Sequence, residues 1–206
     1  MGSVRTQPGS VRPGGRTARV RAAVLRAAGD ALVENGVHGL DLADVAFRAG
    51  VGKTTVYRRW SSVPGLVADL LDDMAEQSLP RSDTGSLLGD LTANARLVRT
   101  TLADPRQGVL FKAVIAAATC DARTAEALNR FYTTRVNEWA PCVEAAARRG
   151  EVPPDTDPHE VIRAVSAPLY YRLLASGDPL DEAAADRAAA AAAIAAREGA
   201  YARTER

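Results

Sequence analysis

Few of the residues that build metal sites, disulfides or membrane spans occur in this sequence of 206 residues. Its two cysteines, Cys120 and Cys142, lie far apart, and it has neither a Cys-x-x-Cys pair nor a histidine cluster, so no metal site is indicated. It has no run of about 18 apolar residues for a membrane-spanning helix, and its N-terminus lacks the apolar stretch of a signal peptide. We therefore expect a cytoplasmic protein with no membrane contact, whose cysteines are small buried residues in a reducing compartment.

Groupings of side chains that are typical of catalysis are also missing. The two histidines, His38 and His159, are expected in a turn and near a helix start, where both would be solvated. No Ser-His-Asp, Cys-His or paired-carboxylate arrangement stands out. We therefore predict that the chain is not an enzyme and has no catalytic residue and no cofactor.

The formal net charge of only +1 conceals an uneven distribution of charge along the chain. Residues 1–60 contain ten Lys and Arg against four acids, whereas residues 61–206 contain 16 and 21. A basic N-terminal part on an acidic remainder is typical of a DNA-binding domain that carries a second domain. With 47% hydrophobic residues, the chain can bury a substantial core without disulfides.

Hydrophobic residues recur at helical spacing along most of the chain, and no segment competes as a strand. Caps and breaks such as Asn35-Gly36 and Asp104-Pro105 set the expected boundaries, and Pro141 is expected to kink or interrupt its helix. The sequence thus predicts an all-α protein of about nine helices. The expected helices are 17–35, two short helices within 41–60, one after Ser61-Ser62, and 87–102, 109–119, 121–149, 157–176 and 181–198.

The most specific pattern is Asp41–Trp60, DLADVAFRAGVGKTTVYRRW. Asp41 is a good N-cap for a first short helix, Ala46 is small enough for close approach of a second helix, and Gly50 can take the left-handed conformation that ends the first. Val56 then returns to the shared core. Two short helices joined in this way form a helix-turn-helix, whose second helix enters the major groove of DNA.

The outward face of this second helix is rich in cations and hydrogen-bond donors, which suit a phosphate backbone and base edges. We predict that it is the DNA-binding site. Its residues are Lys53, Thr54, Thr55, Tyr57, Arg58 and Arg59.

A nucleotide-binding P-loop is a second interpretation of the same segment, because Gly52-Lys53-Thr54 resembles the end of that motif. The full motif needs a glycine five positions before Gly52, where Phe47 stands, and it follows a buried β-strand. The preceding residues alternate badly for a strand, so this interpretation is disfavoured. ATP binding that depends on Lys53 would support it.

Residues from about Val20 to Leu70 resemble the TetR family of bacterial transcriptional regulators. The resemblance rests on an Ala-rich first helix, the Asn35-Gly36 turn, Ala49-Gly50-Val51 and Thr55-Val56-Tyr57. It implies a homodimer in which an N-terminal three-helix unit binds double-stranded DNA and a C-terminal helical domain holds a small effector.

Carried over to this chain, the resemblance implies that Lys53, Thr54 and Thr55 face base edges and that Tyr57 and Arg58 contact phosphates.

Two positions depart from the family pattern. Gly52 stands where the family often has Ser, and it is a weaker cap. Val63 stands where the family usually has Lys, which removes one phosphate contact. Arg59 is a hypothetical substitute for that contact. Trp60 occupies the family's aromatic core position, so we expect it to pack and not to touch DNA.

The alanine-rich helix near the C-terminus allows two interpretations: a solvated low-complexity helix, or an interface on which another helix can pack closely. We prefer the interface, because the preceding helix also has apolar side chains that need a partner. Two such helices from each subunit would form a four-helix dimer bundle. The predicted interface residues are Leu169, Tyr170, Leu173, Ala189, Ala192 and Ala193.

The expected mechanism is a homodimeric repressor that a small-molecule effector releases from a pseudo-palindromic operator. A DNA-binding dimer without an effector remains the alternative. The predicted domains are a disordered basic arm at 1–15, a DNA-binding domain at 16–62 and an effector-binding and dimerisation domain at 63–206. The predicted effector-pocket residues are Phe111, Phe131, Tyr132, Asn137, Trp139 and Tyr171.

Overall fold

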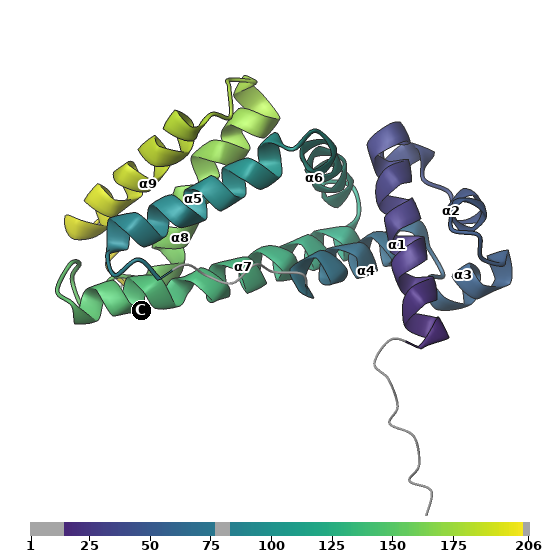
Figure 1. Ribbon diagram of the computed structural model, residues 1–206, viewed down its shortest axis with the longest axis horizontal. Helices are drawn as coiled ribbons and strands as arrows, with labels where there is room; N and C mark the ends of the chain where they lie inside the picture. The colour runs from purple at the N-terminus through teal and green to yellow at the C-terminus, as the bar shows by residue number, and fades with distance from the viewer. Residues whose placement is uncertain (1–14, 77–82, 204–206) are drawn as a thin grey trace, which may run out of the picture.

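The computed structural model describes residues 15–76 and 83–203, and these residues form nine α-helices (Figure 1). No β-strand occurs among them, in agreement with the all-α prediction. The predicted arm lies outside the described residues except for Gly15. The helices are α1 (Arg16–Asn35), α2 (Leu42–Arg48), α3 (Lys53–Arg59), α4 (Val63–Glu76), α5 (Leu87–Ala103), α6 (Pro105–Ala118), α7 (Ala122–Arg148), α8 (Pro158–Tyr171) and α9 (Glu182–Arg197).

Aspartate side chains cap most of these helices at their N-terminal ends. Each carboxylate accepts a hydrogen bond from a backbone N–H group that has no partner within the helix, and it lies at the positive end of the helix dipole. These local interactions explain why helix starts can be predicted from the sequence. The capping residues are Asp41, Asp104, Asp121, Asp157 and Asp181.

The start of α6 differs from the sequence prediction, which placed it at Val109. The helix begins four residues earlier, because the Asp104 carboxylate accepts hydrogen bonds from the backbone N–H groups of Arg106 and Gln107, at 3.0 and 2.7 Å. Pro105 takes the first helical position, where its missing N–H is no loss. The Asp-Pro pair therefore ends one helix and starts the next.

Two prolines within helices have different surroundings. The sequence analysis expected Pro141 to kink or interrupt its helix. α7 runs from Ala122 to Arg148 without a break, so Pro141 does not interrupt it. α8 contains Pro168 and ends at Tyr171, and a π-turn, η2 (Arg172–Ser176), completes the segment that the sequence assigned to one helix.

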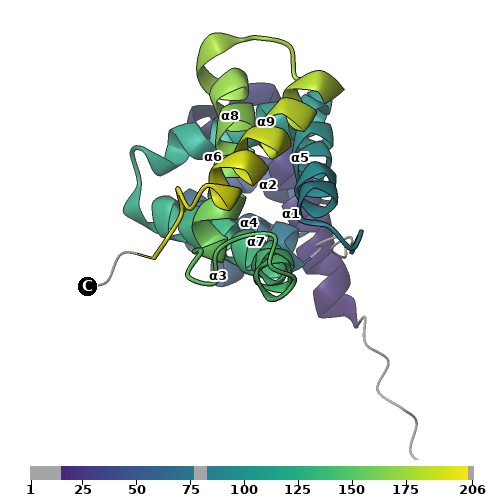
Figure 2. The same ribbon diagram turned by 90° about the vertical axis from the view of Figure 1, so that its left-hand side faces the viewer.

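The helices form a head and a body. The head (α1–α3) lies at one end of the molecule and the body (α5–α9) at the other (Figure 1). α4 joins them, because it packs against α1 and along α7. In the body α9 packs against both α5 and α8 (Figure 2), and α6 contacts α1 of the head as well as α7.

Candidate DNA-binding interface and body cluster

Two short-range hydrogen bonds and one glycine conformation build α2 and the turn that leads to α3. The Asp41 carboxylate accepts a hydrogen bond from the Asp44 backbone N–H at 3.1 Å, which fixes the start of α2. Gly50 has a φ of 64°, a conformation that residues with a Cβ rarely adopt. The chain then turns back, and the Val51 N–H donates to the Ala46 carbonyl at 3.0 Å. This geometry confirms the predicted pair of short helices.

One side of α3 is buried and the other is open to solvent. Val56 is fully buried, as the sequence predicted. At about 100° per residue, Thr54 and Arg58 lie nearly opposite Val56 on the helix, and both are exposed. Tyr57 is 47% exposed and Thr55 is half-buried beside them. Lys53 and Arg59, at the two ends of α3, are also exposed, so five of the six predicted DNA-binding residues reach the surface.

A charged network that the sequence analysis missed holds α3 against the rest of the head. The Trp60 indole N–H, just after α3, donates to the Asp69 carboxylate of α4 at 2.8 Å. Arg21 of α1 donates to the same carboxylate at 2.7 Å and pairs with Asp73 at 2.5 Å. Three helices therefore meet at Asp69. Only the buried indole, which requires a hydrogen-bond acceptor, hints at this carboxylate in the sequence.

The ionisation of Asp69 reflects these partners. Burial alone would raise the pKa of the Asp69 carboxyl, but the hydrogen bonds from Arg21 and Trp60 outweigh burial and lower it below its usual value. The charged form therefore stabilises the folded head.

Arg59 takes part in the same network. Its guanidinium lies 5.1 Å from the Trp60 ring centroid and its Nε lies 3.9 Å from the Asp69 carboxylate. Trp60 itself is buried, as its predicted core role requires. The contact between Arg59 and a phosphate stays a prediction, with part of its charge already balanced by Asp69.

A cluster of aromatic rings occupies the interior of the body. Phe111 of α6 packs on Phe131 of α7 with ring centroids 5.7 Å apart, and on Tyr170 of α8 at 6.3 Å. Tyr132 contacts Phe131 at 5.3 Å and Tyr170 at 5.4 Å. Three of the predicted pocket residues thus meet, and Tyr170, predicted for the interface, joins them.

The Tyr132 hydroxyl is the unusual polar group of this cluster. It is buried and makes no well-formed hydrogen bond within the described part of the chain. Burial, with the neighbouring Tyr170 hydroxyl adding to it, raises the pKa of Tyr132. A buried hydroxyl without a well-formed hydrogen bond is unfavourable.

Arg135 connects the aromatic cluster to α4. Its guanidinium lies 5.2 Å from the Phe131 ring centroid and donates to the Met74 carbonyl in the last turn of α4 at 2.6 Å. Because α4 also holds the head through Asp69, the rings are connected to α3 through Arg135 and α4.

The other three predicted pocket residues lie away from the cluster. Asn137 is exposed, and its side-chain oxygen lies 3.1 Å from Nε2 of His159. Trp139 is buried in the core, about two helical turns beyond Phe131. Tyr171 is 63% exposed on the surface of α8.

The residues predicted for a dimer interface already have neighbours within the chain. On α9 the predicted alanines are buried, and this helix packs against α5 and α8. Leu169 is fully buried as well, and Leu173 is half-buried. Short side chains do allow close helix packing here, but the partner helix belongs to the same chain. The three α9 residues are Ala189, Ala192 and Ala193.

The described residues contain no group of His, Cys, Asp or Glu that could hold a metal ion. None of their helices is long and apolar enough to cross a membrane. A P-loop follows a β-strand, whereas α3 is preceded by α2 and a turn. This order of elements speaks against the P-loop interpretation.

Two family models match most of the chain. Residues 24–70 match the model described as bacterial regulatory proteins of the tetR family, and residues 81–192 match the model described as the tetracyclin repressor-like C-terminal domain. The first match contains the helix-turn-helix, and the second contains the aromatic cluster.

Known proteins align with much of the chain. The HTH-type transcriptional regulator YdeS of Bacillus subtilis is 32% identical over 161 residues, which are 78% of this chain and 81% of YdeS. The DNA-binding transcriptional repressor TetR of Mycobacteroides abscessus is 31% identical, over 79% of this chain and 85% of that protein. The crystal structure of the TetR family transcription regulator SCO0332 aligns with a TM-score of 0.68 and 30% identity, over 85% of this chain and 97% of that one. The chain therefore belongs to the TetR family of DNA-binding transcriptional regulators, and it is not an enzyme.

Proposed function

We propose that the protein is a homodimeric repressor that binds a pseudo-palindromic operator and that a small-molecule effector releases it. The observation that carries this proposal is the aromatic cluster of the body, with its unpartnered Tyr132 hydroxyl and its connection to α4 through Arg135. The M. abscessus relative is named as a repressor, which supports repression as the output.

The DNA contacts are proposed for the exposed face of α3. Lys53, Thr54 and Thr55 would reach base edges, while Tyr57 and Arg58 would bind phosphates. Arg59, at the end of the helix, is the weakest member of this set because it also packs on Trp60. Two such helices in a dimer would enter successive major grooves about 34–36 Å apart.

Dimerisation is proposed through the outward sides of α8 and α9. Their inward sides are occupied within the chain, but Tyr171, Leu174 and Ile194 expose large apolar surfaces. Tyr171 and Leu174 lie at the end of α8 and in η2, and Ile194 lies about three turns along α9. Exposed apolar side chains spread along two neighbouring helices are typical of a helix-bundle interface. Ile194→Glu should therefore raise the dimer dissociation constant, measured by analytical ultracentrifugation.

Release would follow from differential binding of the effector. An effector can shift the heads only if it binds the body better when their spacing no longer fits DNA, because tight binding to both states changes nothing. Entry between the rings would move Phe131, and Arg135 would carry this movement to the Met74 carbonyl of α4.

Selection of genomic DNA fragments with the purified protein tests the DNA-binding side of the proposal. We expect a palindromic site that is bound by a dimer and weakened by Lys53→Ala or Tyr57→Ala. Failure to enrich any sequence, with binding that vanishes as salt rises, would reject sequence-specific repression.

Titration of effector candidates against the operator complex tests the switch. A ligand that binds the body tightly without altering operator affinity would reject release. The rings of the cluster already contact one another, and this packing favours the alternative of a DNA-binding dimer without an effector. Retention of full operator affinity with every ligand that binds the body would establish that alternative.

A further inference from the structure

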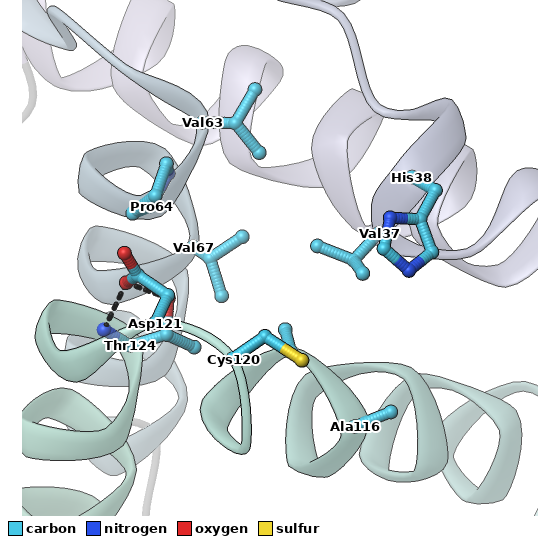
Figure 3. A pocket seen from close by; sticks show the side chains of 10 residues that line it. Val37, His38, Val63, Pro64, Val67, Ala116, Cys120, Asp121 and Thr124 are labelled. Atoms are coloured by element: carbon cyan, nitrogen blue, oxygen red, sulfur yellow. Dashed lines mark hydrogen bonds between the residues drawn. The ribbon is translucent and has the colours of Figure 1, made fainter.

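A small cavity lies between the head and the body, apart from the aromatic cluster (Figure 3). Its volume is about 130 Å³. The walls come from η1 (Val37–Gly39) of the head, from the first two turns of α4, and from the α6–α7 corner of the body. The residues that line it include Val37, Val63, Pro64, Val67, Ala116 and Cys120.

The lining is mainly apolar, with His38, Asp121 and Thr124 as its polar side chains. Asp121 contributes the carboxylate seen in Figure 3, but this group accepts hydrogen bonds from the Thr124 backbone N–H at 2.7 Å and from its hydroxyl at 2.8 Å. Its charge is thus used to cap α7. An apolar cavity of about 150 Å³ is large enough to bind benzene. The size and lining therefore suit a small uncharged hydrocarbon.

The position of the cavity links its occupancy to the head. The two ends of α6, which is about 21 Å long, meet the head differently. At its start, Arg106 forms an ion pair with Asp30 of α1 at 2.6 Å. At its end, Ala116 faces η1 across the open cavity. Near this end α6 also contacts η1, and the cavity lies beside that contact, between α6, η1 and α4. A change in the tilt of the head against α6 would therefore widen or narrow the cavity.

We propose that this junction cavity is a second regulatory site, which binds a small apolar molecule built on a single aromatic ring and thereby weakens operator binding. A molecule in the cavity holds η1 and α4 at a fixed distance from α6. The bound molecule thereby restricts the head movement by which the α3 helices of the two subunits reach successive major grooves. Coupling between two sites of a protein commonly changes affinity about 5- to 150-fold. The site needs no effector in the aromatic cluster, so it goes beyond the function proposed above.

Toluene titration of the full chain tests binding directly. With the methyl groups of the protein labelled for NMR, we expect saturable shifts at Val37, Val63 and Val67. Ala116→Leu, which fills the cavity from its exposed wall, should abolish the shifts. Ala118→Leu on the same helix is the matched control, because Ala118 does not line the cavity. Shifts confined to methyl groups beside the aromatic cluster, such as those of Val114, or no saturable shift, would overturn the proposal.

The effect on DNA is tested with the best fragment from the genomic selection. Saturating toluene should weaken operator binding of the wild type at least about fivefold and leave Ala116→Leu unaffected by toluene. Unchanged affinity of the wild type at saturation would overturn the regulatory role. A wild type that binds no fragment specifically without toluene would instead count against the repressor proposal.

A covalent probe provides an independent test, because Cys120 is exposed and Cys142 is buried. Benzyl methanethiosulfonate transfers a benzylthio group to the thiolate, forming a disulfide and releasing methanesulfinate. The adduct should weaken operator binding, whereas the methylthio adduct of the smaller reagent and treated Cys120→Ser should not. Equal operator affinity of the benzyl adduct and the unmodified protein would contradict the proposal.

Discussion

The head and the body of this protein are stabilised by different means. In the head, three helices meet at one carboxylate, Asp69, which bonds to Arg21 and to the indole of Trp60. In the body, the aromatic rings pack on one another, and the alanines of α9 pack against α5 and α8. The buried Tyr132 hydroxyl makes no well-formed hydrogen bond there. The head thus has a charged anchor and an open polar surface. The body has an apolar interior with few directional bonds among its rings.

This difference suits the two tasks. A DNA-reading helix must keep its exposed side chains in fixed positions, and directional hydrogen bonds to α4 supply that rigidity. The effector site that we propose in the body would have to open for its ligand, and apolar packing without directional bonds can rearrange at lower cost. Four substitutions, each with a control, test this difference between the head and the body.

The largest effect is expected from removing a phenyl ring in the body. Phe111 is buried between two rings, so Phe111→Ala should lower the free energy of unfolding by about 3–5 kcal/mol. The matched control in the head is Phe47→Ala. Phe47 is 84% exposed, and its loss should change stability by no more than about 0.5 kcal/mol. Urea denaturation measures both, and equal effects would contradict the assigned packing.

Removing the charge on α4 that holds the head should have a smaller but clear effect. Asp69→Asn weakens the bonds to Arg21 and Trp60, and we expect a loss of about 1–3 kcal/mol. Asp72→Asn on the same helix removes only an exposed ion pair with Arg130, worth less than about 1 kcal/mol. If the two variants unfold at the same urea concentration, the network does not anchor the head.

Acid should reveal the same carboxylate. Because the folded pKa of Asp69 is lowered, its stabilisation is present above the unfolded value, about 3.9, and is lost as pH falls through the folded value. The fluorescence of Trp60 reports on the head and that of Trp139 on the body. The Trp139→Phe variant therefore shows the head signal alone, and Trp60→Phe shows the body signal alone. We compare the free energy of unfolding of Trp139→Phe with that of the double variant that also carries Asp69→Asn. The double variant should show a weaker dependence of this free energy on pH below about 4. An unchanged slope would exclude Asp69 as the group responsible.

The smallest change in stability is expected at the buried hydroxyl of the body. Tyr132→Phe removes a group without a partner and should be neutral or stabilising, by up to about 1 kcal/mol. Thr156→Val is the control, because the buried Thr156 hydroxyl donates to the Pro153 carbonyl at 2.7 Å, and its loss should destabilise. A clear loss of stability in Tyr132→Phe would mean that the hydroxyl has a partner.

Local signals explain what the sequence could predict. Helix starts follow capping aspartates, and the turn of the helix-turn-helix follows Gly50, because these interactions join residues only a few positions apart. The exposed face of α3 follows from one buried position, Val56. The early start of α6 was missed because Asp104-Pro105 was taken only as the end of the preceding helix.

Contacts between distant segments could not be predicted in this way. Arg21 and Asp69 are 48 positions apart, and nothing in either local pattern pairs them. The alanine face of α9 correctly indicated close helix packing, but periodicity cannot say whether the partner belongs to the same chain. Similarly, aromatic residues at helical spacing did not reveal that Phe111 and Tyr132 meet Tyr170 while Tyr171 faces solvent.

The most direct test of the account is the salt dependence of operator binding by Arg58→Ala. Arg58 is exposed on α3 opposite the buried Val56, and each phosphate contact adds about 0.9 to the slope of log K against log salt. In a dimer we therefore expect the slope to fall by about 2. Arg163→Ala, which removes an equal charge from the body, should leave the slope unchanged. Equal slopes for Arg58→Ala and the wild type would contradict the claim that this face of α3 binds the operator.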